Sequence, residues 1–222
     1  MFTLYHYHLC PSSRFIRLLL DEYKIEYITQ LENYWKPQED FLLLNPAGHL
    51  PVLIDSYNFP IVGFNACVEY IKDLNRNPKI FSDDYRKKAE IYRLYHWFDT
   101  LFKKEVLDPI IYEKVFSRIV ENVTPNSVNI RNAMQNLGFH IKYLEYLLKD
   151  KDYLVDDTYT SCDFLAAASL SVLDYLGLLN LDDYPKLQEW YFKLKSRPSF
   201  KNLLKDHIVG LTPHENYKLL DI

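Results

Sequence analysis

The segment LYHYHLCPSSRFIRLLL, residues 4–20, leads from an extended run into a helix and places Cys10 at the junction. Phe2–Tyr7 is a short run rich in aromatic side chains, which favours a strand. Ser12–Tyr23 carries apolar side chains at helical spacing. A strand followed at once by a helix is typical of the start of an α/β domain.

The sequence up to Leu74 continues this alternation of strands and helices. Ser56, Tyr57 and Asn58 form a turn-like stretch, so the apolar runs on either side of it should form a hairpin. The further elements expected here are strands at Ile25–Thr29, Pro51–Asp55 and Phe59–Val62, and helices at Gln38–Leu44 and Phe64–Leu74. A right-handed βαβ crossover followed by a hairpin on one sheet predicts a thioredoxin-like domain over residues 1–75.

The second part of the chain has almost no strand pattern. Leu74–Asp84 is polar, contains a proline and breaks the periodicity, so it is the predicted linker. The helices expected beyond it are Tyr85–Lys104, Ser127–Asp150, Ser161–Leu176, Lys186–Ser196 and Ser199–Lys205. The predicted fold class is therefore α/β plus all-α, with a helical domain over residues 84–205 and a tail over residues 206–222.

The predicted helix that begins at Ser161 is the candidate for the centre of the second domain. Its sequence FLAAASLSVLDYL, residues 164–176, is apolar on nearly every face, as in helices that are buried all round. Thr160 and Asp163 have capping-box spacing, in which each side chain can bind the other residue's backbone N–H. We therefore expect these two residues to have a structural role.

The composition disfavours several classes of protein. The chain has 222 residues, of which 48% are apolar and 25% are charged, as in soluble globular proteins. The net charge of −4 gives no reason to expect a polyanion, so nucleic acid is disfavoured as a partner. No signal-peptide pattern and no apolar run of the ~20 residues that a membrane span needs is present, so we expect a cytoplasmic protein. Cys10, Cys67 and Cys162 are widely scattered, which favours reduced thiols over a disulfide or a zinc site.

Four stretches resemble the glutathione S-transferase (GST) superfamily, and the resemblance extends over essentially the whole chain. YHLCPSSRFIRLLL is similar to the first strand, catalytic turn and first helix of the family, and NPAGHLPVLID to its cis-proline turn. YTSCDFLAAA is similar to the capping box of the buried sixth helix, and WYFKLKSRPSF to the closing helices. The resemblance implies the GST fold and a homodimer, whereas an activity has to be argued from the site.

Cys10 is the candidate catalytic residue. The resemblance places it where serine-type members have serine and omega-like and beta-like members have cysteine. The free N–H groups of a helix start favour a thiolate, so we expect the pKa of Cys10 to lie below its ordinary value. A thiolate here would stabilise the glutathione thiol or form a mixed disulfide with it. The alternative is a half-buried thiol that only packs under a loop. His6 and His8 share a strand face, but without a third ligand we expect no metal site.

The rest of a glutathione site is expected to be incomplete. The resemblance implies that Leu50, before a cis Pro51, pairs its backbone with the cysteinyl part of glutathione. The family's acid–serine pair, which binds the γ-glutamyl group, falls on Gly63 and Phe64. Without a charged partner and a hydroxyl, binding should weaken by roughly 2–5 kcal/mol. We therefore expect no cofactor, or glutathione bound only weakly.

Two surface features are candidates for binding a partner. Trp35 lies in a polar loop without periodic apolar neighbours, so it lines a ligand site, anchors a partner or folds back on the sheet. The tail is too apolar for a free disordered end. It packs over the helical domain or the cleft, or it presents Tyr217, Leu220 and Asp221 to a partner.

A narrower resemblance concerns a subgroup of the superfamily, the alphaproteobacterial FtsZ-localised, GST-like regulators of cell division. The stretches FTLYHYHLCPSSRFIR, PIIYEKVFSR and LDYLG, together with the end of the tail, resemble it. The subgroup implies binding to FtsZ, the tubulin-like division protein, without conjugation of glutathione. We therefore expect a mainly non-catalytic, homodimeric FtsZ-binding regulator. The alternative is a glutathione-dependent transferase or thiol transferase that uses Cys10.

Overall fold

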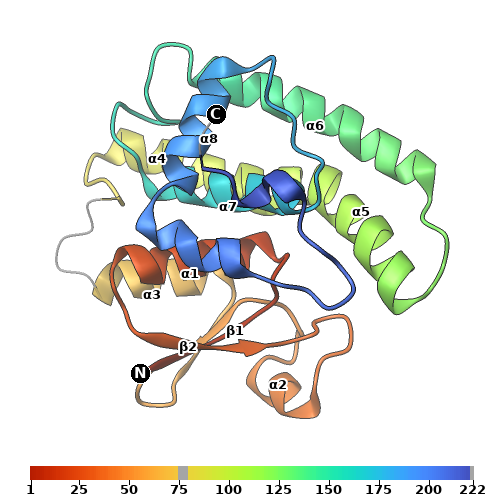
Figure 1. Cartoon of the computed structure of the whole chain (residues 1–222). Helices are drawn as coiled ribbons and strands as arrows, with labels where there is room; N and C mark the ends of the chain where they lie inside the picture. The colour runs from red at the N-terminus through yellow and green to blue at the C-terminus, as the bar shows by residue number, and fades with distance from the viewer. Residues whose placement is uncertain (75–79, 221–222) are drawn as a thin grey trace.

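The first part of the chain forms a four-stranded mixed sheet with helices on its two faces (Figure 1). The computed structural model describes residues 1–74 and 80–220. The first elements are β1 (Phe2–His6), α1 (Pro11–Glu22), β2 (Tyr27–Leu31), α2 (Glu39–Leu44), β3 (Val52–Ile54), β4 (Pro60–Val62) and α3 (Phe64–Leu74). The strand order is β2-β1-β3-β4, with β1 parallel to β2 and the other pairs antiparallel. This arrangement confirms the predicted thioredoxin-like fold.

The second strand begins two residues later than the sequence pattern predicts. At the end of α1 the N–H of Ile25 donates to the carbonyl of Leu20 (2.9 Å), and Lys24 has a left-handed backbone with φ 54°. Because this turn uses Ile25 to close the helix, pairing with β1 starts only at Tyr27, opposite Phe2.

The second part of the chain is helical, as predicted. Its elements are α4 (Tyr85–His96), η1 (Trp97–Leu107), α5 (Asp108–Ile111), η2 (Tyr112–Val120), α6 (Ser127–Leu147), α7 (Ser161–Tyr175), α8 (Pro185–Lys195), η3 (Pro198–Lys205) and η4 (Glu215–Lys218). None of the described helices combines the length and the apolar character that crossing a membrane requires. Part of the predicted linker, residues 75–79, lies outside the described residues, and the domain boundaries stay predictions.

Helical structure runs on well beyond Lys104, where the sequence pattern predicted an end. The segments η1 and η2 are π-helices, and they continue α4 through α5 as far as Val120. The hydrogen bonds of a π-helix join residues i and i+5, so its apolar side chains do not keep the 3.6-residue spacing of an α-helix. Helical structure over residues 105–120 was therefore not predicted from the sequence pattern.

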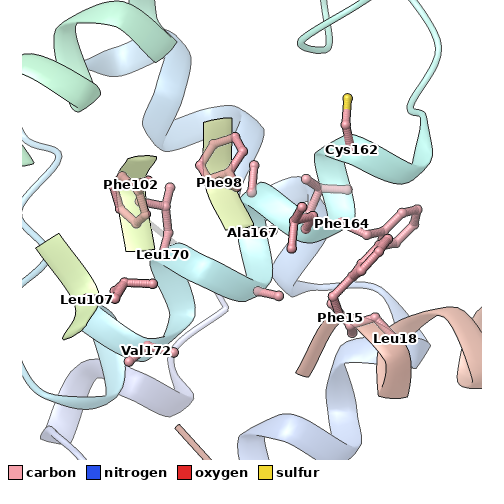
Figure 2. Close-up of a cluster of buried hydrophobic side chains, with 14 of the residues drawn as sticks. Phe15, Leu18, Phe98, Phe102, Leu107, Cys162, Phe164, Ala167, Leu170 and Val172 are labelled. Carbon is pink, nitrogen blue, oxygen red and sulfur yellow. The ribbon is translucent and has the colours of Figure 1, made fainter. Parts of the chain in front are cut away.

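Helix α7 forms the centre of the molecule, as its sequence predicts. Every residue of α7 except Asp174 is buried. Figure 2 shows Phe15 and Leu18 of α1 on one side of α7 and the aromatic residues Phe98 and Phe102 of η1 on another. The first domain is thus joined to the second through an apolar core.

The start of α7 has the capping box that the sequence predicts. The Asp163 carboxylate accepts the N–H of Thr160 (2.7 Å) and its hydroxyl (2.9 Å). It also accepts the N–H of Leu154 (2.9 Å) and the indole N–H of Trp190 (3.0 Å). Asp163 therefore joins the helix start to the preceding loop and to α8.

The tail packs back on the helical domain. The N–H of His214 donates to the carbonyl of Tyr175 (2.9 Å), and the Tyr175 hydroxyl donates to the carbonyl of Leu211 (2.9 Å). The His214 ring lies against Gly177, where a Cβ atom would come within 2.5 Å of it. Gly177 also has φ 67°, so glycine is required there for both reasons.

Candidate functional site

A cleft of about 330 Å³ lies between the two parts of the chain at the start of α1. One wall comes from the first domain and includes Cys10, Leu50 and Gly63. The opposite wall comes from η1 and α5 and includes Asp99, Lys103 and Asp108. The residues predicted for a glutathione site therefore lie around one cavity, which is called the Cys10 cleft below.

Cys10 is the N-cap residue of α1 and is half-buried. Burial raises the pKa of the Cys10 thiol, whereas the hydroxyl and backbone N–H of Ser13 lower it by a smaller amount. The net direction is upward, opposite to the predicted depression. A helix start favours a thiolate, but the loss of hydration on burial outweighs this effect for Cys10.

We expect Cys10 to react with iodoacetamide at neutral pH more slowly than a free thiol, because its raised pKa leaves less thiolate. It should still react faster than Cys67 and Cys162, which are buried and whose pKa values burial also raises, to about 12 for Cys67. Mass spectrometry of the labelled peptides measures all three rates in one sample. A rate for Cys10 above that of free cysteine would contradict this expectation.

The positions of the family's glutathione clamp carry no carboxylate and no hydroxyl. The Leu50–Pro51 peptide bond is cis, as the resemblance implies. Gly63 has φ 90°, a left-handed conformation in which an acidic side chain would be strained. The Phe64 ring is turned into the core, where it lies 5.7 Å from the ring of Phe15 and 5.5 Å from that of Tyr95.

The charged wall of the Cys10 cleft was missed in the sequence. The hydroxyl of Ser12 donates to Asp99 (2.6 Å), so the start of α1 is bonded to η1. Lys103 Nζ lies 2.9 Å from the carboxylate of Asp108, five residues further on. The five-residue spacing of Lys103 and Asp108 follows from the π-helical turn, which bonds residues i and i+5. A search for pairs at this spacing would have found them only if the π-helix had been expected.

Trp35 folds back as a half-buried residue of an aromatic cluster. Its ring centroid lies 4.9 Å from that of Tyr7, 5.4 Å from that of Tyr34 and 4.4 Å from that of Phe116. Phe116 belongs to η2, so the cluster joins the first domain to the helical one. Of the three alternatives for Trp35, the structure thus shows a side chain that folds back and packs on its neighbours. The exposed part of the Trp35 ring remains available to a ligand or partner.

The prediction that Tyr217 contacts a partner is wrong. Its side chain is 0% exposed. Its hydroxyl accepts a hydrogen bond from the Arg14 guanidinium and donates one to the carbonyl of Leu203 (3.0 Å). Leu220, in contrast, is 41% exposed, and its carbonyl accepts a bond from Ser196 (3.4 Å). Asp221 lies outside the described residues.

No group of three or more potential ligands that could hold a metal ion occurs in residues 1–74 and 80–220. His6 and His8 do lie together, with ring centroids 5.2 Å apart. Burial and the neighbouring Arg17 lower the pKa of His6 to about 3, so it is neutral at physiological pH.

The fold, with a cysteine at the start of α1 and a cis-proline beside it, matches one family over both parts of the chain. Residues 9–74 match the glutathione S-transferase N-terminal domain, and residues 113–207 match the C-terminal domain. The chain belongs to the glutathione S-transferase family.

Within that family, the chain is similar to FtsZ-localized protein A of Caulobacter vibrioides. The two are 36% identical over 222 residues, which cover 99% of this chain and 97% of the relative. A solved structure of FzlA from C. crescentus superposes with a TM-score of 0.96 at 36% identity, covering 100% of this chain and 99% of that one. A glutathione S-transferase from Rhodospirillum rubrum has a TM-score of 0.95 at 35% identity, and the match covers 100% of both chains.

Proposed function

We propose that this chain is a cytoplasmic, homodimeric regulator of bacterial cell division that binds FtsZ and does not conjugate glutathione. The FtsZ-localized relative, with which it aligns over nearly its whole length, supports the cell-division role. The observation that carries the non-catalytic part is the state of the clamp. Gly63 has no side chain and its N–H already donates to the carbonyl of Pro51 (3.0 Å), while the Phe64 ring packs against Phe15.

The Cys10 cleft is poorly suited to activate a glutathione thiol. A γ-glutamyl group carries an ammonium and a carboxylate, and the family binds them with an acid and a serine. Here the clamp positions Gly63 and Phe64 carry neither group, and burial raises the pKa of the Cys10 thiol, which favours its protonated form. A weakly held substrate beside a protonated thiol would react slowly.

Exposed apolar side chains support the homodimer. Five of them lie on the β3–β4 hairpin, on β4 and on α4: Tyr57, Phe59, Val62, Tyr85 and Tyr92. Exposed aromatic side chains of this kind are enriched where protein chains contact each other. Sedimentation equilibrium measures the state directly, and a monomer at micromolar concentration would contradict the proposal.

The proposed surface for FtsZ consists of two parts, the exposed edge of Trp35 and the end of the tail. The tail contributes Leu219, Leu220 and Asp221, the last from its position in the sequence alone. Binding surfaces depend on a few aromatic and apolar anchors, and this chain presents such anchors beyond those that its core requires.

Trp35→Ala and Leu220→Ala are each expected to weaken co-sedimentation with FtsZ polymers by about tenfold or more, as for an anchor of an interface. Phe139→Ala and Val209→Ala are the matched controls, since these side chains are 72% and 86% exposed and lie on α6 and elsewhere in the tail. The melting temperature should change by only a few degrees.

Three results would count against this assignment. The first is an absence of FtsZ binding by the parent protein, and the second is unchanged binding by both anchor variants. The third is a large fall in melting temperature on Trp35→Ala, which would make the aromatic cluster structural. Deletion of the tail from Tyr217 onward is unsuitable as a test, because Tyr217 is part of the core.

A glutathione-dependent transferase or thiol transferase is the second candidate, and the position of Cys10 beside Leu50 in one cleft favours it. Because the clamp is incomplete, we expect reduced glutathione to bind at millimolar strength or weaker in a calorimetric titration. Micromolar binding would overturn the non-catalytic proposal and return the function to Cys10.

A further inference from the structure

Two buried arginines of α1 hold the tail. The guanidinium of Arg14, 0% exposed, donates to the hydroxyl of Tyr217 and to the carbonyl of His8 (2.9 Å). The guanidinium of Arg17 binds both carboxylate oxygens of Asp206, each at 2.8 Å. The beginning of the tail and its last helical turn are therefore both bonded to the same helix.

The same helix forms one end of the Cys10 cleft. Cys10 is its N-cap, Pro11 and Ser12 line the cavity, and the N–H of Arg14 donates to the carbonyl of Cys10 (2.9 Å). Cys10 and Arg14 thus lie one helical turn apart on a rigid element. A displacement of the helix start would therefore also move the guanidinium that holds Tyr217.

Tyr217 also determines where the proposed partner-binding residues lie. Leu219 and Leu220 come two and three residues after it and are half exposed, while the N–H of Leu219 donates to the carbonyl of Asn216 (3.0 Å). The anchor and the exposed side chains are therefore parts of one short turn. Movement of Tyr217 would therefore change the surface that these leucines present.

We infer that the Cys10 cleft and the tail surface are energetically coupled through α1, so that a group occupying the cleft changes how tightly the tail binds its partner. Arg14 and Tyr217 are the positioning residues of this coupling. The partner, FtsZ, rests on the proposed function, but the coupling itself does not. By thermodynamic linkage, binding at the tail must change the affinity of the cleft for its occupant by the same factor as occupation of the cleft changes the affinity of the tail for its partner.

The first experiment measures the coupling without a partner. Tyr217→Phe keeps the buried ring but removes the hydroxyl that Arg14 binds. We expect alkylation of Cys10 by iodoacetamide to become about fivefold faster or more, while Cys67 and Cys162 remain unreactive. Tyr191→Phe is the control, since it also removes a buried hydroxyl, one that donates to Asp174 of α7 (2.8 Å). An unchanged rate in Tyr217→Phe, or an equal increase in both variants, overturns the inference.

The second experiment tests whether a group attached to Cys10 in the cleft changes the tail and its binding to the partner. Protein alkylated at Cys10 is compared with unmodified protein in co-sedimentation with FtsZ polymers, and hydrogen exchange is followed at the amides of His214 and Tyr217. We expect faster exchange at these amides and a changed affinity for FtsZ. Faster exchange without any FtsZ binding by either sample supports the coupling and rejects only the proposed function. Unaltered exchange rejects the coupling, whatever FtsZ does.

Discussion

Asp163→Ala is expected to lower the free energy of unfolding by about 4 kcal/mol or more. The carboxylate accepts three N–H groups and one hydroxyl, from Leu154, Thr160 and Trp190. All of these donors lie in the interior, and a buried donor without a partner costs about 1–3 kcal/mol. Truncation also removes the cap of α7, the helix around which both domains pack.

Urea denaturation followed by circular dichroism measures the effect on Asp163→Ala. Asp163→Asn should lose less, because its amide oxygen still accepts. Asp156→Ala is the control for removing a carboxylate, since Asp156 pairs with Lys87 at the partly exposed surface, where such pairs contribute less than about 1 kcal/mol. A loss below about 2 kcal/mol for Asp163→Ala would mean that the helix start rearranges and satisfies its own donors.

Asp206→Asn is expected to destabilise the protein by about 3–5 kcal/mol, because Arg14 and Arg17 would remain buried without the carboxylate that lies within 4.0 Å of both. Burial raises the pKa of the Asp206 carboxyl, but hydrogen bonds from His8 and Arg17 lower it by more, so the pKa lies well below its usual range. The carboxylate is thus far more stable in the folded chain than in the unfolded one.

Because the pKa of Asp206 is lowered on folding, the difference in unfolding free energy between the parent and Asp206→Asn depends on pH. The folded pKa is lower than the unfolded value of about 3.9, so the contribution of Asp206 is fully present above that value and is lost as pH falls towards the folded pKa. The difference between the parent and Asp206→Asn should be constant from about pH 5 to 8 and shrink below about pH 4. A difference that stays constant down to pH 3 would show that the charge of Asp206 is not what stabilises the tail.

Sequence patterns predicted the parts of the fold that depend on periodicity and caps. The central helix α7 was found because its apolar residues cover every face and Thr160 and Asp163 have capping-box spacing. The end of the first long helix was wrong, because π-helical turns do not follow the 3.6-residue period. The start of β2 was displaced, because the turn after α1 uses two more residues than the apolar pattern indicates.

The candidate site was predictable in position and less so in chemistry. The resemblance brought Cys10, Leu50, Gly63 and Phe64 to one cleft, since a shared fold fixes where these segments meet. The pKa of Cys10 depends on its burial, which a single sequence does not contain. Tyr217 was misjudged for a related reason, because an aromatic residue in a tail looks accessible until the buried arginine that binds it is known.

The aromatic cluster around Trp35 has a consequence for measurement. Its ring lies between Tyr7 of the first domain and Phe116 of the second. Trp97 contacts His140 and Tyr143, and Trp190 is bonded to Asp163, so both lie wholly within the helical domain. Indole emission is sensitive to the surroundings of the ring, so separation of the two domains should alter the fluorescence of Trp35 and leave that of the other two nearly constant. The chain therefore contains a natural fluorescent reporter of cleft opening, and no label has to be attached.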